Sequence, residues 1–85
     1  MLKLILYIGV NCPKCPAAHK IIEEVAGELR LVKGRDYVEK DIDDDDVIIE
    51  ALQHQIANTP AIIINDEAVF IGEVPIKKEL IEKLK

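Results

Sequence analysis

A nearly continuous apolar run near the start of the chain restricts the possible fold more than any other feature. Residues 2–8 read Leu-Lys-Leu-Ile-Leu-Tyr-Ile. A strand buried on both faces has this character, whereas a strand with one exposed face alternates apolar and polar residues. A strand covered on both faces needs packing layers on both sides of its sheet. Together with the helical and extended patterns that follow it, the run predicts an α/β architecture with helices on both faces of a sheet.

The rest of the chain alternates between helical and extended patterns. Apolar side chains recur with helical spacing over residues 13–31, and Lys33-Gly34 should end that helix. The further predicted elements are a strand at 36–42, a helix over 47–56 after an acidic run at 43–46, a strand at 61–64, a turn at 65–67, a strand at 68–71 and a last helix opened by Pro75. This βαβαββα order predicts a single domain, residues 1–85, with a four-stranded mixed sheet. Its first two strands are parallel with a right-handed crossover, and a hairpin adds antiparallel strands.

Charge and composition exclude several classes of function. The net charge is −5, which argues against a general nucleic-acid binder. No apolar run approaches the roughly 20 residues of a membrane span. The opening segment lacks a basic leader and a small-residue cleavage site, so a strand is expected there rather than a signal peptide. We expect a cytoplasmic monomer that binds neither nucleic acid nor membrane.

The two cysteines lie in the segment Cys12-Pro13-Lys14-Cys15, shortly after the first predicted strand. In a reducing compartment such a pair is more often catalytic or metal-binding than structural. A helix start offers free N–H groups and the positive end of the helix dipole, which stabilise a thiolate, and Lys14 adds a positive charge. Cys12 would then be the nucleophile and Cys15, one turn inward, the resolving thiol. This chemistry requires no metal and no organic cofactor.

A second motif, Thr59-Pro60, directly precedes the predicted strand at 61–64. A strand leading to Cys-Pro-x-Cys at a helix start, a Thr-Pro opening a hairpin, a glycine turn and a final helix together resemble the thioredoxin/glutaredoxin family. The resemblance covers nearly the whole chain and is closest to the small archaeal-type glutaredoxin-like thioredoxins.

This resemblance implies a thioredoxin-like fold and a dithiol oxidoreductase that reduces protein or small-molecule disulfides through Cys12 and Cys15. It also implies a cis Pro60 packed beside the disulfide. The backbone of Thr59 would pair with an extended substrate segment.

Two positions depart from the family pattern. Larger thioredoxins carry a buried acid on the strand before the cysteines, and residues 2–8 contain none. Glutathione-using glutaredoxins show two adjacent glycines after the hairpin, but here Gly72 is followed by the bulky anion Glu73. We expect disulfide-containing proteins as substrates, with the upstream reductant left open between a reductase and glutathione.

Other functions stay open for the cysteine pair. The protein could instead be a Cu(I)- or Zn-binding metallochaperone that uses Cys12 and Cys15, since two thiolates bind Cu(I) in copper chaperones. A structural zinc site would need two more ligands. A redox-sensing interaction module would use the disulfide to change partners without turnover. Outside the pair, we expect His19 and His54 on solvated helix faces. Tyr7 and Phe70 are expected in the core.

The acidic run at 43–46 also invites a calcium interpretation. The EF-hand pattern needs glycine at its sixth position and glutamate at its twelfth, and no register here supplies both. We interpret the run instead as capping residues, because aspartate at the N-cap and in the first turn complements the helix dipole.

Overall fold

The computed structural model describes residues 4–56 and 58–84. The elements in chain order are β1 (Leu4–Ile8), α1 (Cys15–Leu29), β2 (Tyr37–Asp41), α2 (Asp45–Gln53), β3 (Ala61–Ile64), β4 (Glu67–Ile71) and α3 (Lys77–Leu84). This is the predicted βαβαββα order. Leu2 and Lys3, with which the first predicted strand begins, lie outside the described residues. Within the described ranges, no helix is long and apolar enough to cross a membrane.

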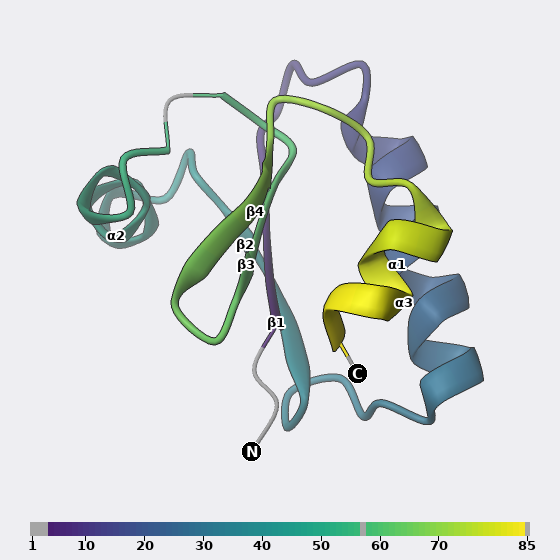
Figure 1. The fold of residues 1–85 in the computed structure, drawn as a ribbon. Helices are drawn as coiled ribbons and strands as arrows, with labels where there is room; N and C mark the ends of the chain where they lie inside the picture. The colour runs from purple at the N-terminus through teal and green to yellow at the C-terminus, as the bar shows by residue number, and fades with distance from the viewer. Residues whose placement is uncertain (1–3, 57, 85) are drawn as a thin grey trace.

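The four strands form one mixed sheet in the order β2-β1-β3-β4. β1 runs parallel to β2 and antiparallel to β3, and β3 runs antiparallel to β4. Helices α1 and α3 cover one face of the sheet and α2 covers the other (Figure 1). β1 is thus an inner strand covered on both faces. The fold class and the burial predicted from the apolar run are confirmed.

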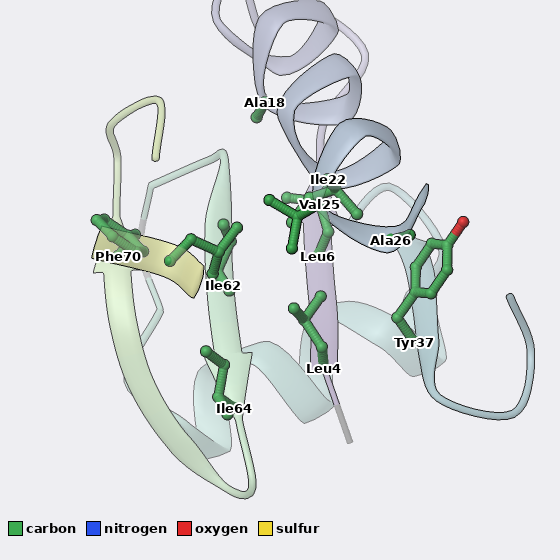
Figure 2. Close-up of a cluster of buried hydrophobic side chains, with 11 residues drawn as sticks. Leu4, Leu6, Ala18, Ile22, Val25, Ala26, Tyr37, Ile62, Ile64 and Phe70 are labelled. Atoms are coloured by element: carbon green, nitrogen blue, oxygen red, sulfur yellow. The ribbon is translucent and has the colours of Figure 1, made fainter. Parts of the chain in front are cut away.

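Most of the core lies between the sheet and the pair α1 and α3. Leu6 and Ile62 point from the sheet toward Ile22 and Val25 of α1 (Figure 2). A smaller cluster packs under α2 on the other face and contains Ile5, Tyr7, Ala51, Ile56, Ala61 and Ile63. Neighbouring residues of β1 and β3 therefore serve opposite faces, as the pleat of a strand requires. The expected core positions of Tyr7 and Phe70 are confirmed, at 0% and 6% exposure.

The ends of α1 differ from the sequence prediction. The helix begins at Cys15, not at residue 13, so Pro16 falls in the first turn, where a missing N–H breaks no helical bond. It ends at Leu29, well before Gly34. Arg30 adopts the left-handed conformation with φ 57°, and the Leu31 N–H donates to the Ala26 carbonyl at 2.8 Å. Glycine is the usual residue at such a closure, so an arginine there gives no sequence signal.

Other element ends shift by one to three residues, the largest being the end of α2 at Gln53 instead of residue 56. α2 takes in part of the acidic run and begins at Asp45, because the Asp44 side chain caps it by accepting from the Asp46 N–H at 3.0 Å. Asn65 and Asp66 both have positive φ, which makes a two-residue hairpin turn, so Glu67 belongs to β4 and not to the turn. α3 begins at Lys77, two residues after Pro75.

Candidate active site

Segments far apart in the sequence meet at the edge of the sheet where β1 ends. Ile8 is paired with Asp41 at the end of β2, and Tyr7 with Ala61 at the start of β3. Ala61 is paired in turn with Ile71 at the end of β4. The loops that carry the cysteines, the Thr-Pro motif and the glycine turn are therefore neighbours. The motifs singled out in the sequence share one site.

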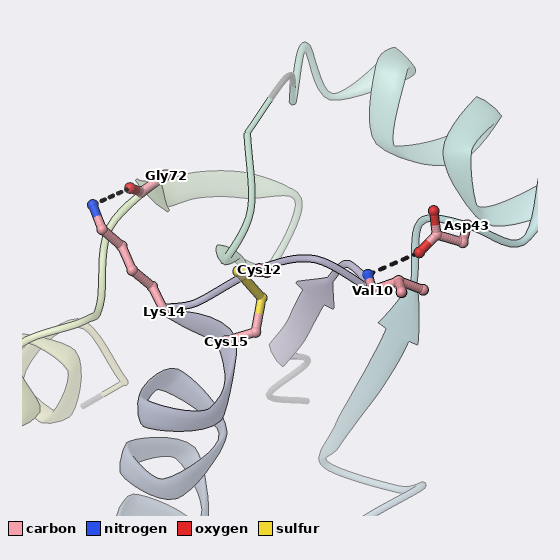
Figure 3. Close-up of a disulfide and its surroundings, with 6 residues drawn as sticks. All are labelled: Val10, Cys12, Lys14, Cys15, Asp43 and Gly72. Atoms are coloured by element: carbon pink, nitrogen blue, oxygen red, sulfur yellow. Dashed lines mark hydrogen bonds between the residues drawn. A yellow bond between two sulfur atoms is a disulfide. The ribbon is translucent and has the colours of Figure 1, made fainter.

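Cys12 and Cys15 form a disulfide at this edge, with their Cα atoms 5.4 Å apart (Figure 3). Cys12 lies in the loop before α1 rather than at the helix start, which corrects the predicted position. Cys15 is the first residue of the helix, and its N–H donates to the Cys12 carbonyl at 3.3 Å. Access to the two residues differs: Cys12 is partly exposed, whereas Cys15 is only 6% exposed.

Two surface hollows flank the disulfide. The larger has a volume of about 430 Å³ and is lined by Asn11, Cys12, Pro13, Lys14, Ile42, Asn58, Thr59, Ile71 and Gly72. The smaller has a volume of about 250 Å³ and is lined by Ile8, Gly9, Val10, Cys12, Cys15, Pro16 and His19. Cys12 borders both hollows and Cys15 only the smaller one. A molecule that enters from either side reaches Cys12.

The Thr-Pro motif forms one wall of the larger hollow. The Thr59–Pro60 peptide bond is cis, as the family resemblance implied, and Pro60 is buried. The Pro60 carbonyl accepts from the Gly72 N–H at 2.8 Å. Within residues 4–56 and 58–84, the backbone N–H and C=O of Thr59 have no hydrogen-bond partner. Backbone groups without a partner can hydrogen-bond to an extended segment that lies beside them.

Gly72 forms the opposite wall of the larger hollow, and its lack of a side chain lets Asn58 lie close to its backbone. Its φ is +74°, and a Cβ at this position would lie 3.1 Å from the Asn58 Cβ. Its carbonyl accepts from the Lys14 Nζ at 3.4 Å, and Figure 3 shows the Lys14 side chain extended toward it. Lys14 therefore borders the site as predicted, but its amino group is directed to the end of β4. Its effect on the Cys12 thiolate stays a prediction.

A hydrogen bond that the sequence did not reveal holds the loop before Cys12. The Val10 N–H donates to the Asp43 carboxylate at 2.8 Å (Figure 3). Asp43 is itself fixed, because its N–H donates to the Asp41 side chain at 2.9 Å. The acidic run at 43–46 therefore has a second role besides capping α2. It ties the loop after β2 to the loop that carries the nucleophile candidate.

His19 lies on the smaller hollow, one helical turn after Cys15. Its Nδ1 contacts Glu39 Oε1 and its Nε2 lies 2.9 Å from Glu23 Oε1. The His19 side chain is 41% exposed. The expected solvated position is correct in part, but the contact with Glu39 on β2 and the place beside Cys15 were missed. A helical spacing of four from Cys15 was the available signal.

A polar network of Tyr7, Lys40 and Glu50 lies on the α2 face of the sheet. The Tyr7 hydroxyl donates to Glu50 Oε1 at 2.7 Å, and Lys40 Nζ lies 2.9 and 3.0 Å from the two Glu50 oxygens. Burial, and then the bond to Glu50, raise the pKa of Tyr7 well above its usual value. Hydrogen bonds from Lys40 and Tyr7 lower the pKa of Glu50. None of the three side chains lines either hollow beside the disulfide.

The described residues contain no group of three or more His, Cys, Asp or Glu that could hold a metal ion. The metal interpretation of this edge rests on the two thiolates of Cys12 and Cys15. That is a donor set for a soft ion such as Cu(I), and it is too small for structural zinc.

Known proteins match the chain over almost its full length. Residues 2–85 match the family model described as "Thioredoxin domain". The thioredoxin of Methanocaldococcus jannaschii is 33% identical over 87 residues, which cover 98% of this chain and 92% of the relative. A protein called probable thioredoxin, from Archaeoglobus fulgidus, is 34% identical over 88 residues, covering 100% and 91%. The solution structure of a thioredoxin-like protein from Clostridium perfringens superposes with a TM-score of 0.75 at 17% identity, over 99% of this chain and 68% of that one.

Proposed function

Because the chain belongs to the thioredoxin family, a family of dithiol oxidoreductases, we propose that it reduces disulfides with Cys12 as the attacking and Cys15 as the resolving thiol. The difference in access between the two cysteines carries the proposal. Cys12 is partly exposed and borders both hollows, whereas Cys15 is 6% exposed. A substrate disulfide can reach the Cys12 sulfur. The Cys15 sulfur is close enough to attack Cys12 and displace the bound substrate thiol.

The reaction is two successive exchanges in which two electrons pass to the substrate. The Cys12 thiolate attacks one substrate sulfur and the first substrate thiol leaves, which gives a mixed disulfide. The Cys15 thiolate then attacks the Cys12 sulfur. The bond between Cys12 and the substrate breaks, the second substrate thiol leaves, and the Cys12–Cys15 disulfide forms. No metal or organic cofactor takes part in either exchange.

The surroundings of the disulfide favour extended protein segments as substrates. The backbone of Thr59, which has no partner among the described residues, can hydrogen-bond to a segment that lies in the larger hollow, in the manner of strand addition. Exposed apolar side chains stand on both sides, with Val10 72% and Ile71 43% exposed. Such side chains favour apolar substrate segments.

The regenerating partner is a reductase or glutathione, and the position of Glu73 favours the reductase. Glu73 follows Gly72 at the wall of the larger hollow and is exposed. Its carboxylate would repel the carboxylates of glutathione. A dithiol that must return to its reduced form suits a cytoplasmic monomer that meets its partners by diffusion.

Replacing each cysteine separately tests the two roles. Cys12→Ser should lose all reduction of insulin or DTNB in the presence of a reductant, because no attacking thiolate remains. Cys15→Ser should form a mixed disulfide with substrate that persists, which mass spectrometry detects. His54→Gln at the end of α2 is the matched control and should keep the activity. Full activity of Cys12→Ser would contradict the assigned roles.

The same protein separates the proposal from its rivals. Anaerobic titration with Cu(I) or Zn(II) should give no tight stoichiometric complex if disulfide exchange is the function. Tight binding without exchange would make the protein a metal carrier. Slow exchange together with a change in partner affinity between the oxidised and reduced forms would make it a redox sensor.

A further inference from the structure

The smaller hollow contains a group that the proposed function leaves without a role. Among the described residues that line this hollow, His19 is the one titratable side chain besides the cysteines. It follows Cys15 by four residues on α1, a spacing that puts two side chains on the same helix face about 5–6 Å apart. Imidazole is the side chain that exchanges protons most readily near neutral pH.

The resolving exchange needs a proton acceptor near Cys15. Only the thiolate attacks, so the Cys15 thiol must lose its proton first. Bulk water has little access to a residue that is 6% exposed. β1, described from Leu4 to Ile8, offers no carboxylate to take that proton. The smaller hollow is the path by which a base reaches Cys15.

The contacts of His19 suit a base. A carboxylate only accepts hydrogen bonds, so contact with Glu39 places a proton on Nδ1. Nε2 is then the acceptor when the imidazole is neutral and its contact with Glu23 is broken. Glu39 is 13% exposed and is flanked by Lys33, whose Nζ lies 4.0 Å from the other oxygen. Glu39 therefore holds the ring in one orientation, as a carboxylate does for a general base.

The carboxylate of Glu23, on the other side of the ring, suits the protonated form of His19. Glu23 lies 2.9 Å from Nε2 on the same helix and is 60% exposed. An exposed pair of this kind contributes little, so Nε2 can leave it for a thiol proton or a bridging water. Once Nε2 carries a proton, Glu23 accepts the hydrogen bond. Both protonation states of the ring thus have partners.

We propose that His19, oriented by Glu39, accepts the proton of Cys15 in the resolving exchange. The Cys15 S–H bond breaks and the proton passes to His19 Nε2, directly or through one water. The thiolate then forms the bond to Cys12 and expels the substrate thiolate, which takes a proton from the imidazolium or from solvent. The inference depends on the proposed function, because it assigns a base to its second step.

Two phases of DTNB reduction separate the steps. With reduced protein in excess, attack by Cys12 releases one thionitrobenzoate, and resolution by Cys15 releases the second. In His19→Gln we expect an unchanged first phase and a second phase slowed about tenfold or more at pH 7, within the usual contribution of a general base. The second phase of the variant should keep rising with pH, whereas that of the wild type should level off.

Matched variants control the measurement. Glu39→Gln keeps the ring but loses the negative charge that strengthens its contact with Nδ1, so its second phase should slow less than that of His19→Gln and retain a levelled profile. His54→Gln should behave as wild type. A second phase of His19→Gln with the wild-type rate and profile would overturn the inference. Equal slowing at every pH would overturn it too, since that marks a structural effect. If the wild type releases no thionitrobenzoate at all, the proposed function fails instead.

Discussion

The two faces of the sheet are covered through different kinds of contact. On one face, α1 and α3 cover a large cluster of side chains that is apolar apart from the hydroxyl of Tyr37. On the other face, the nine-residue helix α2 covers a smaller cluster, and Tyr7 and Lys40 both bond to Glu50 at its margin. The outer surface of α2 also leaves Ile49 and Leu52 58% and 61% exposed.

This difference indicates where the stability of the fold resides. Burial of apolar area stabilises the α1 face, and this contribution does not depend on a particular direction of each contact. The α2 face has less apolar area to bury and depends in addition on hydrogen bonds that act only in one arrangement. We expect the first face to dominate the free energy of unfolding and the second to respond to pH.

Adjacent isoleucines of β3 compare the faces directly. Ile62 points to the α1 face and Ile63 to the α2 face, at 0% and 1% exposure. Ile62→Ala should cost about 3–5 kcal/mol and Ile63→Ala about 2–3 kcal/mol, because the shorter helix can settle into the smaller cavity. Urea denaturation of both variants measures the difference. An equal or larger loss in Ile63→Ala would break the comparison.

Glu50→Gln should remove the acid dependence of the α2 face. The lowered pKa of Glu50 means that its contribution is complete above the unfolded value, near 4.3, and is lost as the pH falls through the folded value. The variant should lose about 1–2 kcal/mol at pH 7 and show a flatter decline of stability toward pH 3. Chemical denaturation across that range tests this, with exposed Glu67→Gln as control. Parallel curves for wild type and Glu50→Gln would count against the network.

Tyr7→Phe should reduce the stability less than Glu50→Gln does. Lys40 continues to satisfy Glu50, so the loss is that of one hydrogen bond, about 1 kcal/mol. The raised pKa of Tyr7 adds a signature at high pH. Its contribution is complete below the unfolded value near 10 and is lost above it, as the unfolded tyrosine ionises first. Thermal melts at pH 7 and pH 10.5 should show a smaller change between the two conditions for the variant.

An ion pair on the α1 face should contribute least to the free energy of unfolding. Lys77 of α3 lies 2.8 Å from Glu28 of α1, and both side chains are well exposed, at 38% and 51%. Glu28→Gln should lower the melting temperature less than Tyr7→Phe does, and the difference from the wild type should vanish in 1 M salt. Thermal melts at low and high salt measure it. A loss above that of Tyr7→Phe would show that the helices of this face also depend on polar contacts.

The sequence predicted the features that depend on local patterning. The apolar run around Leu4–Ile8 identified a strand buried on both faces, because only a covered strand tolerates apolar side chains on both sides. Spacing identified Cys12 and Cys15, and the family resemblance implied the cis bond at Pro60. The first two signals are each contained in a few neighbouring residues, whereas the cis bond was implied by the order of motifs along nearly the whole chain.

Features that join separate elements could not be predicted in the same way. The bond of Val10 to Asp43 and the contact of His19 with Glu39 depend on the register between β1 and β2 and on how α1 crosses the sheet. One sequence does not determine that register to a single residue. The early end of α1 was missed for a local reason, since Arg30 adopts a conformation usually taken by glycine.

Gly72 places a constraint on how this sequence can diverge. Its left-handed backbone, the Asn58 side chain beside it and the bond of its N–H to Pro60 all act on one position. Any side chain there would push against the segment that carries the cis proline. We expect descendants of this sequence to vary freely at the exposed neighbour Glu73 while retaining glycine at 72. Substrate preference could then evolve at residue 73 without disturbing the segment beside the disulfide.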